Sequence, residues 1–202
     1  MPTLLAINSS PQGAASASRA LVEHFAATWT KKTGGTVRQR DASGRSIPHV
    51  DGALIGAFFT PPAARTAEQK ALLAPSDEMI AELKSADAVV IGVAMHNFGV
   101  PSSLKAYVDH VIRVGETFSY GATGPVGLIN DKPLYLLRTS GGDYSAAPML
   151  GFNHAETFLG DIFRFVGLKT QHTVSANGLA MGGDARDEGL TKAKAQIDAL
   201  LA

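Results

Sequence analysis

A short, almost continuous apolar run over Val89–Val93, followed by a polar loop, constrains the fold of this chain more than any other feature. A run of this length is typical of a strand that is buried on both faces of a parallel sheet. The loop His96–Gly99 follows, and Pro101 then suits the first turn of a helix, where a backbone N–H is not needed. The stretch predicts a strand, a loop and a helix whose apolar face returns to the sheet, formed by Leu104, Tyr107, Val108 and Val111.

The same unit of strand, loop and helix recurs along the chain. We expect strands at residues 3–7, 36–41, 87–93, 133–138 and 171–176. Helices are expected from the end of loop 8–18 to Gly34, from the capping box at Thr66–Gln69 to Pro75, from Ser76 onward, over 101–113, over 152–166 and at the C-terminal end. Residues 42–65 and 115–132 show no regular pattern, so we expect two long irregular excursions there.

This alternation predicts the fold class. Strands that alternate with helices, without internal repeats or a linker, form a parallel sheet with right-handed crossovers and helices on both faces. We therefore expect residues 1–202 to be a single three-layer α/β domain with a five-stranded parallel sheet. The flavodoxin-like strand order 2-1-3-4-5 is favoured over the Rossmann order.

Charge and composition exclude several classes of function. Lysine plus arginine and aspartate plus glutamate balance at 18 each, which argues against binding to nucleic acid or to an anionic membrane surface. The chain has no cysteine, and its histidines lack metal-ligand spacing, so we expect no disulfide and no metal site. No apolar run approaches the roughly 18 residues of a membrane span, and the first residues read as a strand rather than a signal peptide. A soluble cytoplasmic protein is expected.

The first loop lacks the two best-known phosphate-binding motifs. Gly13 is its only glycine, where the dinucleotide fingerprint needs three, and the Gly-Lys-Ser/Thr of a P-loop does not occur. Ser10, Ser16 and Ser18 remain, beside the backbone amides of a helix N-terminus, which bind phosphate through the helix dipole. The alternative is that Ser16 or Ser18 only caps the helix.

Three loops are expected to meet at the carboxyl edge of the sheet, where open α/β sheets bind ligands. They are the serine-rich loop, the loop at Met95–Phe98 and the glycine-rich loop at Thr139–Gly142. A flavin fits this combination, because its pyrimidine edge needs mixed donors and acceptors, which the backbone and Asn97 supply. Amides of the Gly141-Gly142 loop would stabilise the negative charge of a reduced flavin, although a Gly-Gly pair alone is more often an ordinary turn.

The sequence resembles the FMN-dependent NADH-azoreductase family of flavodoxin-like proteins, which is related to the NAD(P)H quinone reductases. The resemblance covers nearly the whole chain. It rests on Ser9-Ser10, Ser16-Ala17-Ser18-Arg19, Met95-His96-Asn97-Phe98-Gly99-Val100-Pro101, Leu104-Lys105-Ala106-Tyr107-Val108-Asp109-His110, Gly115-Glu116-Thr117-Phe118-Ser119-Tyr120, Gly124-Pro125-Val126-Gly127-Leu128 and Ser140-Gly141-Gly142.

The resemblance implies a homodimer in which each active site is completed by the neighbouring subunit. It implies hydride transfer from NADH or NADPH to the N5 atom of bound FMN, and then to a quinone or azo compound in a ping-pong sequence, with no catalytic side chain in the hydride step. It assigns FMN contacts to Ser10, Ser16, Ala17, Ser18, Met95, His96, Asn97, Phe98, Thr139, Ser140, Gly141 and Gly142. Two positions depart from the family pattern: His96 stands where tyrosine is frequent, and Ser140 stands where arginine is common.

Aromatic residues are the candidates for the walls of the substrate slot, because flat substrates stack on such rings. These candidates are Phe59, Phe118, Tyr120, Tyr144 and Phe163, although a single aromatic residue is more often part of the core. Tyr144 and His96 are also candidate proton donors, and His96 could equally make a structural hydrogen bond. The rival function is a non-catalytic flavin electron carrier or redox sensor on the same fold. The sequence leaves open the choice between NADH and NADPH.

Overall fold

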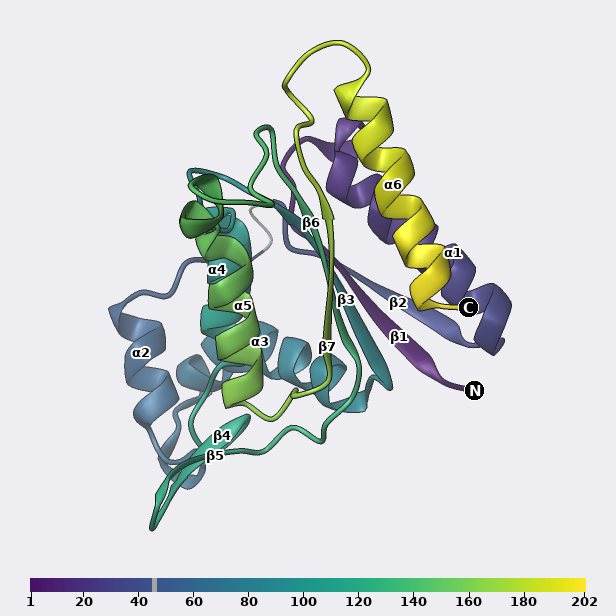
Figure 1. Ribbon diagram of the computed structural model, residues 1–202. Coiled ribbons are helices and arrows are strands. Elements are labelled where there is room, and N and C mark those ends of the chain that lie inside the picture. The colour runs from purple at the N-terminus through teal and green to yellow at the C-terminus, as the bar shows by residue number, and fades with distance from the viewer. Residues whose placement is uncertain (45–46) are drawn as a thin grey trace.

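A five-stranded parallel sheet runs through the middle of the molecule, in the order β2-β1-β3-β6-β7 (Figure 1). The computed structural model describes residues 1–44 and 47–202. The strands are β1 (Thr3–Asn8), β2 (Thr36–Asp41), β3 (Ala88–Ala94), β6 (Leu134–Thr139) and β7 (Gln171–Ala176). Numbered among themselves, these strands have the order 2-1-3-4-5, so the predicted flavodoxin-like topology is confirmed.

Helices cover both faces of the sheet (Figure 1). On one face lie α1 (Ala17–Thr33) and α6 (Ala185–Leu200), which contact each other. The other face carries α3 (Ala67–Ser85), α4 (Ser102–Val111) and α5 (His154–Phe165). Successive residues of a strand point to opposite faces, so Leu4 and Ala6 pack in the core beneath α1, while Leu5 and Ile7 pack in the core on the other side.

The start of α1 is set by local hydrogen bonding. The side chain of Ser16 accepts a hydrogen bond from the amide of Arg19 at 3.2 Å, which makes Ser16 the N-cap. The helix ends at Gly34, whose φ of 66° lies in the left-handed region that favours glycine. A short 3-10 turn, η1 (Gly13–Ala15), precedes the cap and completes the loop after β1.

The predicted break at Pro75 is wrong, because α3 runs through the proline without interruption. Pro75 cannot donate to the carbonyl of Ala71, but tertiary contacts hold the next turn in place. Ser76 is fully buried and donates to the carbonyl of His110 at 2.6 Å, while its oxygen accepts from the guanidinium of Arg113 at 2.8 Å. Ser76 is therefore an anchor between α3 and α4, and the expectation that it begins a new helix is also wrong.

The two excursions that we expected to be irregular contain regular structure. Residues 42–65 hold α2 (Gly52–Phe59) and a 3-10 turn, η2 (Pro62–Ala64), while residues 45–46 of this stretch lie outside the described residues. Asp51 caps α2, and Leu54 and Ala57 pack against Leu73 of α3. The second excursion holds an antiparallel hairpin of β4 (Phe118–Gly121) and β5 (Gly124–Gly127). A further 3-10 turn, η3 (Met149–Phe152), leads into α5.

The hairpin lies at the end of the sheet opposite to the carboxyl ends of β1, β3 and β6 (Figure 1). A Cβ atom at Gly127 would come within 2.4 Å of the backbone of Val166, so the hairpin packs closely against the segment after α5. None of the helices in residues 1–44 and 47–202 has both the length and the apolarity needed to cross a membrane.

Candidate functional site

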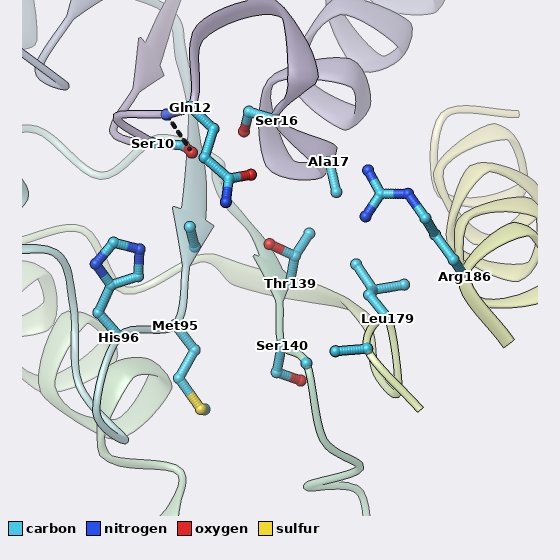
Figure 2. A pocket seen from close by; sticks show the side chains of 13 residues that line it. Ser10, Gln12, Ser16, Ala17, Met95, His96, Thr139, Ser140, Leu179 and Arg186 are labelled. Carbon is cyan, nitrogen blue, oxygen red and sulfur yellow. Dashed lines mark hydrogen bonds between the residues drawn. The ribbon is translucent and has the colours of Figure 1, made fainter. Parts of the chain in front are cut away.

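A pocket opens at the carboxyl edge of the sheet, where the loops after β1, β3, β6 and β7 meet (Figure 2). This is the edge at which the sequence predicts a ligand site. Both polar and apolar groups line the pocket: Ser10, Gln12, Ser16, Ala17, Ala94, Met95, His96, Thr139, Ser140, Gly141, Leu179, Ala180 and Arg186. Its floor comes from the ends of β3 and β6, and its walls come from the flanking loops.

The serine-rich loop presents the N-terminus of α1 to this pocket. The backbone amides of Ala17 and Ser18 have no acceptor among the described residues, as expected for the first turn of a helix. No acidic residue lies in that turn, so the positive end of the helix dipole is not neutralised there. The loop therefore offers free amides and the Ser10 and Ser16 side chains to an anion.

Ser16 caps α1, as the alternative predicts, but it does not only cap the helix, because it also lines the pocket. The hydroxyl of Ser18 lies 3.1 Å from that of Ser16 and is buried behind the loop.

Gly92 of β3 lets the first turn of α1 pack directly against the sheet. A Cβ at Gly92 of β3 would lie 2.7 Å from Val22 and 3.1 Å from the carbonyl oxygen of Ser18, so α1 sits directly on the strand at this point.

The loop after β3 is a tight turn held in an uncommon backbone conformation. His96 and Gly99 exchange both backbone hydrogen bonds, at 3.0 and 2.9 Å. The two residues between them, Asn97 and Phe98, have φ angles of 48° and 69°, which is the pattern of a type I′ turn. Phenylalanine is disfavoured at such angles, and strained residues of this kind concentrate at binding sites. The carbonyl of Phe98 accepts from two amides at the start of α5, which holds the turn.

The amides of Asn97 and Phe98 have no acceptor in the described part of the chain. The Asn97 carboxamide has no hydrogen-bond partner there either. The turn thus exposes backbone donors together with one carboxamide beside the pocket. Met95 and His96 line the pocket directly.

The glycine-rich loop after β6 turns its carbonyl groups away from the pocket. The carbonyls of residues 140–142 accept hydrogen bonds from the amides of residues 178–180, which belong to the loop after β7. The amides of Gly141 and Gly142, in contrast, have no acceptor among the residues that the structure describes. This loop therefore supplies a third pair of adjacent free donors at the same edge, suited to stabilising negative charge on a ligand.

A buried arginine supports this loop from below. Arg138 is 3% exposed, and it donates to Ser140 Oγ at 3.0 Å and to Asn177 Oδ1 at 2.8 Å. Its Nε atom lies 3.6 Å from a carboxylate oxygen of Glu156. Burial lowers the pKa of the Arg138 guanidinium, and Glu156 opposes that shift. The guanidinium links the loops after β6 and β7 and places a positive charge next to Ser140, which lines the pocket.

The aromatic candidates for the substrate slot are dispersed. Phe163 is fully buried among the core residues beneath α5, so it has no surface to offer a substrate, and we correct that assignment. Phe118 packs on Phe165 and on Tyr120 in the hairpin. Phe59, on α2, and Tyr120 are each 73% exposed, and neither lines the pocket of this chain.

Tyr144 is the aromatic candidate nearest to the glycine-rich loop. A Cβ at Gly142 would lie 3.3 Å from its ring, and its ring meets that of Phe98 edge-on, with 6.1 Å between the centroids. Sequence reasoning missed the segment after β7, in which the loop contributes Leu179 and Ala180 and the first turn of α6 contributes Arg186. The available signal was that the fifth strand of a parallel sheet ends at the same edge as the others.

Comparisons with known proteins agree with this geometry. A family model described as a flavodoxin-like fold matches residues 2–201. An FMN-dependent NADH:quinone oxidoreductase of Cellvibrio japonicus is 45% identical over 199 residues, covering 98% of each chain. A protein of the same name from Marinomonas sp. is 46% identical over 199 residues, again covering 98% of each chain.

Solved structures give the same picture. An azoreductase from Bacillus anthracis superposes with a TM-score of 0.90 at 28% identity, covering 100% of this chain and 99% of that one. An FMN-dependent NADH-azoreductase from the same species, solved in complex with FMN, superposes with a TM-score of 0.89 at 27% identity, covering 100% of this chain and 98% of that one.

Proposed function

The chain belongs to the flavodoxin-like family, within the group whose curated members are named FMN-dependent NADH:quinone oxidoreductases, and from that premise we propose that it is an enzyme of this kind. The resemblance seen in the sequence is thereby confirmed. The proposed reaction moves electrons from a reduced nicotinamide, through bound FMN, to quinones and azo compounds. The choice of acceptors follows the names of the related proteins.

One observation carries the proposal: three loops at one edge of the sheet each leave two adjacent backbone amides without an acceptor in residues 1–44 and 47–202, and all three loops border one pocket. The amides of Ala17 and Ser18, with the hydroxyls of Ser10 and Ser16, would hold the phosphate. The amides of Gly141 and Gly142 would donate to the polar edge of the ring. The turn at Asn97 would supply further donors and a carboxamide acceptor.

When bound, FMN would supply the redox chemistry, because its ring takes up a hydride and releases it again. The protein would orient the ring and stabilise charge. Gly141 and Gly142 provide preorganised donors where negative charge develops on reduction, and the guanidinium of Arg138 lies behind them. His96 borders the pocket and Tyr144 borders the glycine-rich loop, so both stay proposed proton donors to the reduced acceptor.

We propose further that the enzyme is a homodimer, with each pocket completed by the neighbouring subunit. The apolar side chains of Phe98, Leu150 and Phe152 are 41%, 52% and 44% exposed, and the Phe98 and Phe152 rings lie 5.1 Å apart. Such a cluster beside a pocket suits a subunit interface. Tyr120 and Phe59, which stand away from the pocket of their own chain, would reach substrate only from a second subunit. Light scattering of the purified protein would give the mass that tests this.

A cytoplasmic site of action is part of the proposal, because NADH and NADPH are supplied there. The absence of cysteine is compatible with that compartment.

Steady-state kinetics test the enzymatic function. Initial rates with NADH and with NADPH, measured at several fixed quinone concentrations in the presence of FMN, are expected to show turnover and parallel double-reciprocal lines. Parallel lines would arise because donor and acceptor occupy the same slot in turn. Intersecting lines would contradict the shared slot. Binding of FMN without turnover of any quinone or azo dye would instead favour the electron carrier or redox sensor.

A further inference from the structure

Arg186 stands out among the side chains around the pocket, because it alone of the described lining residues carries a permanent charge. It lies in the first turn of α6, and Figure 2 shows its side chain reaching from α6 toward Ala17 at the start of α1. Among the described residues, the side chain makes one hydrogen bond, a long contact of 3.4 Å from Nη2 to the carbonyl of Ala15. Two segments far apart in the sequence thus approach each other through this side chain.

Neither local structure nor ion pairing explains the arginine. A cation in the first turn of a helix opposes the helix dipole, so α6 itself gains nothing from it. The acidic residues Asp187 and Glu188 lie in the same turn, yet within the described part of the chain Arg186 forms no ion pair with them, and Glu188 pairs with Lys192 instead. The guanidinium remains free to meet a ligand at the mouth of the pocket.

The place to which it points is the proposed phosphate cradle. Ser16 and Ala17 line the same pocket as Arg186, and the amides of Ala17 and Ser18 have no acceptor among the described residues. These neutral donors carry no full positive charge. A phosphate monoester has a charge between −1 and −2 near neutral pH, and a guanidinium can donate to two of its oxygens at once. Arg186 therefore adds the one complete positive charge that the cradle otherwise lacks.

We propose that Arg186 recognises the terminal phosphate of the flavin, so that the protein distinguishes FMN from riboflavin through this side chain. The inference rests on the proposed function, because it assumes that the pocket holds FMN. It assigns to the first turn of α6, which sequence reasoning did not connect with the site, the role of closing the phosphate end of the pocket. The contact with Ala15 would give way to the phosphate on binding.

The test is flavin binding, measured by fluorescence quenching in flavin-free protein. Arg186→Ala is expected to weaken FMN binding about tenfold, the loss typical of one charge-assisted contact, and to change riboflavin binding less than twofold. Arg186→Lys should retain part of the FMN affinity, because the charge remains without the planar fork. The salt dependence of FMN binding should be weaker in Arg186→Ala than in the wild type.

Lys194→Ala is the matched control, because Lys194 is an exposed cation on the same helix that does not line the pocket. It should leave both flavin affinities unchanged. Equal losses for FMN and riboflavin in Arg186→Ala would overturn the inference and make Arg186 a support for the loop at Ala15. An unchanged FMN affinity would overturn it as well. A wild-type protein that binds neither flavin would refute the proposed function itself, and the inference with it.

Discussion

Replacing Arg138 by methionine should lower stability and weaken flavin binding together. Methionine keeps most of the side-chain volume, so the change removes the charge and the hydrogen bonds without leaving a large cavity. The structure gives the guanidinium hydrogen bonds of 3.0 Å to Ser140 and 2.8 Å to Asn177, and a 3.6 Å approach to Glu156. Ser140 and Asn177 belong to the two loops that the arginine joins.

The magnitude follows from these contacts. Each hydrogen bond from a charged donor is worth about 1.5–3 kcal/mol, and the gain is reduced because the buried charge and the unpartnered Nε atom cost free energy in the native protein. The Glu156 side chain is 36% exposed, so it can be hydrated when its partner is lost. We therefore expect the free energy of unfolding to fall by about 2–4 kcal/mol, less than when a fully buried carboxylate is stranded.

Urea denaturation of flavin-free protein measures the first effect, because bound flavin would mask it. Arg164→Met is the control. Arg164 also pairs with a carboxylate, but the two side chains are 56% and 80% exposed, so its removal should change the free energy of unfolding by less than about 0.5 kcal/mol. A loss below about 1 kcal/mol for Arg138→Met would refute the assigned network.

The second effect separates Arg138 from Arg186. Loss of Arg138 loosens the loop that presents the Gly141 and Gly142 amides to the ring, and both flavins share that ring. FMN and riboflavin should therefore be weakened by the same factor, about tenfold if half of the lost stability is needed to order the loop. A loss confined to FMN would contradict this role of Arg138.

Three further outcomes follow from single positions. Gly92→Ala should push the start of α1 away from β3, because the new Cβ would lie 3.1 Å from the Ser18 carbonyl oxygen. Urea denaturation should show that the free energy of unfolding falls by about 1–3 kcal/mol, and titration with FMN should show a weaker affinity. An unchanged affinity would refute the role of this contact. Pro75→Ala should raise the free energy of unfolding by about 1–3 kcal/mol, since alanine restores the donor to Ala71 in α3, and a loss of stability would contradict this. Hydrogen bonds from the Thr170 backbone, and also from the Lys169 backbone and the Thr170 side chain, lower the pKa of Asp131. The ionised carboxylate therefore stabilises the fold above about pH 4, and this contribution is lost as the pH falls through the folded pKa. Asp131→Asn should melt at a lower temperature than the wild type at pH 7 and at nearly the same temperature at pH 2, and a difference in melting temperature that does not change with pH would exclude this role of the carboxylate.

The parallel sheet could be predicted from the sequence because strands that are buried on both faces consist of nearly continuous apolar runs. The expected strand at 171–176 matches β7, and the one at 87–93 differs from β3 by one residue at each end. The loop positions at the carboxyl edge follow from the strands, so the sequence predicts Met95, Thr139 and Ser140 as site residues, and all three line the pocket.

Features that depend on tertiary contacts were missed. Pro75 reads as a helix end, but the buried Ser76 and its bonds to α4 hold the helix through it. The segment Gly52–Phe59 contains two glycines, so its sequence does not predict a helix. The helix α2 forms because Asp51 caps it and because it packs on α3. Phe163 shows the converse problem, because an aromatic side chain in the sequence does not reveal whether it faces the core or a ligand. Arg186 lies 170 residues from Ser16, and only the fold brings them to one pocket.

An anaerobic absorption spectrum of the FMN-loaded protein tests the central claim most directly. We predict that NADH or NADPH bleaches the flavin bands, that a quinone then restores them, and that the faster nicotinamide identifies the donor. A protein that binds no FMN, or whose bound flavin neither nicotinamide can bleach, would contradict the account.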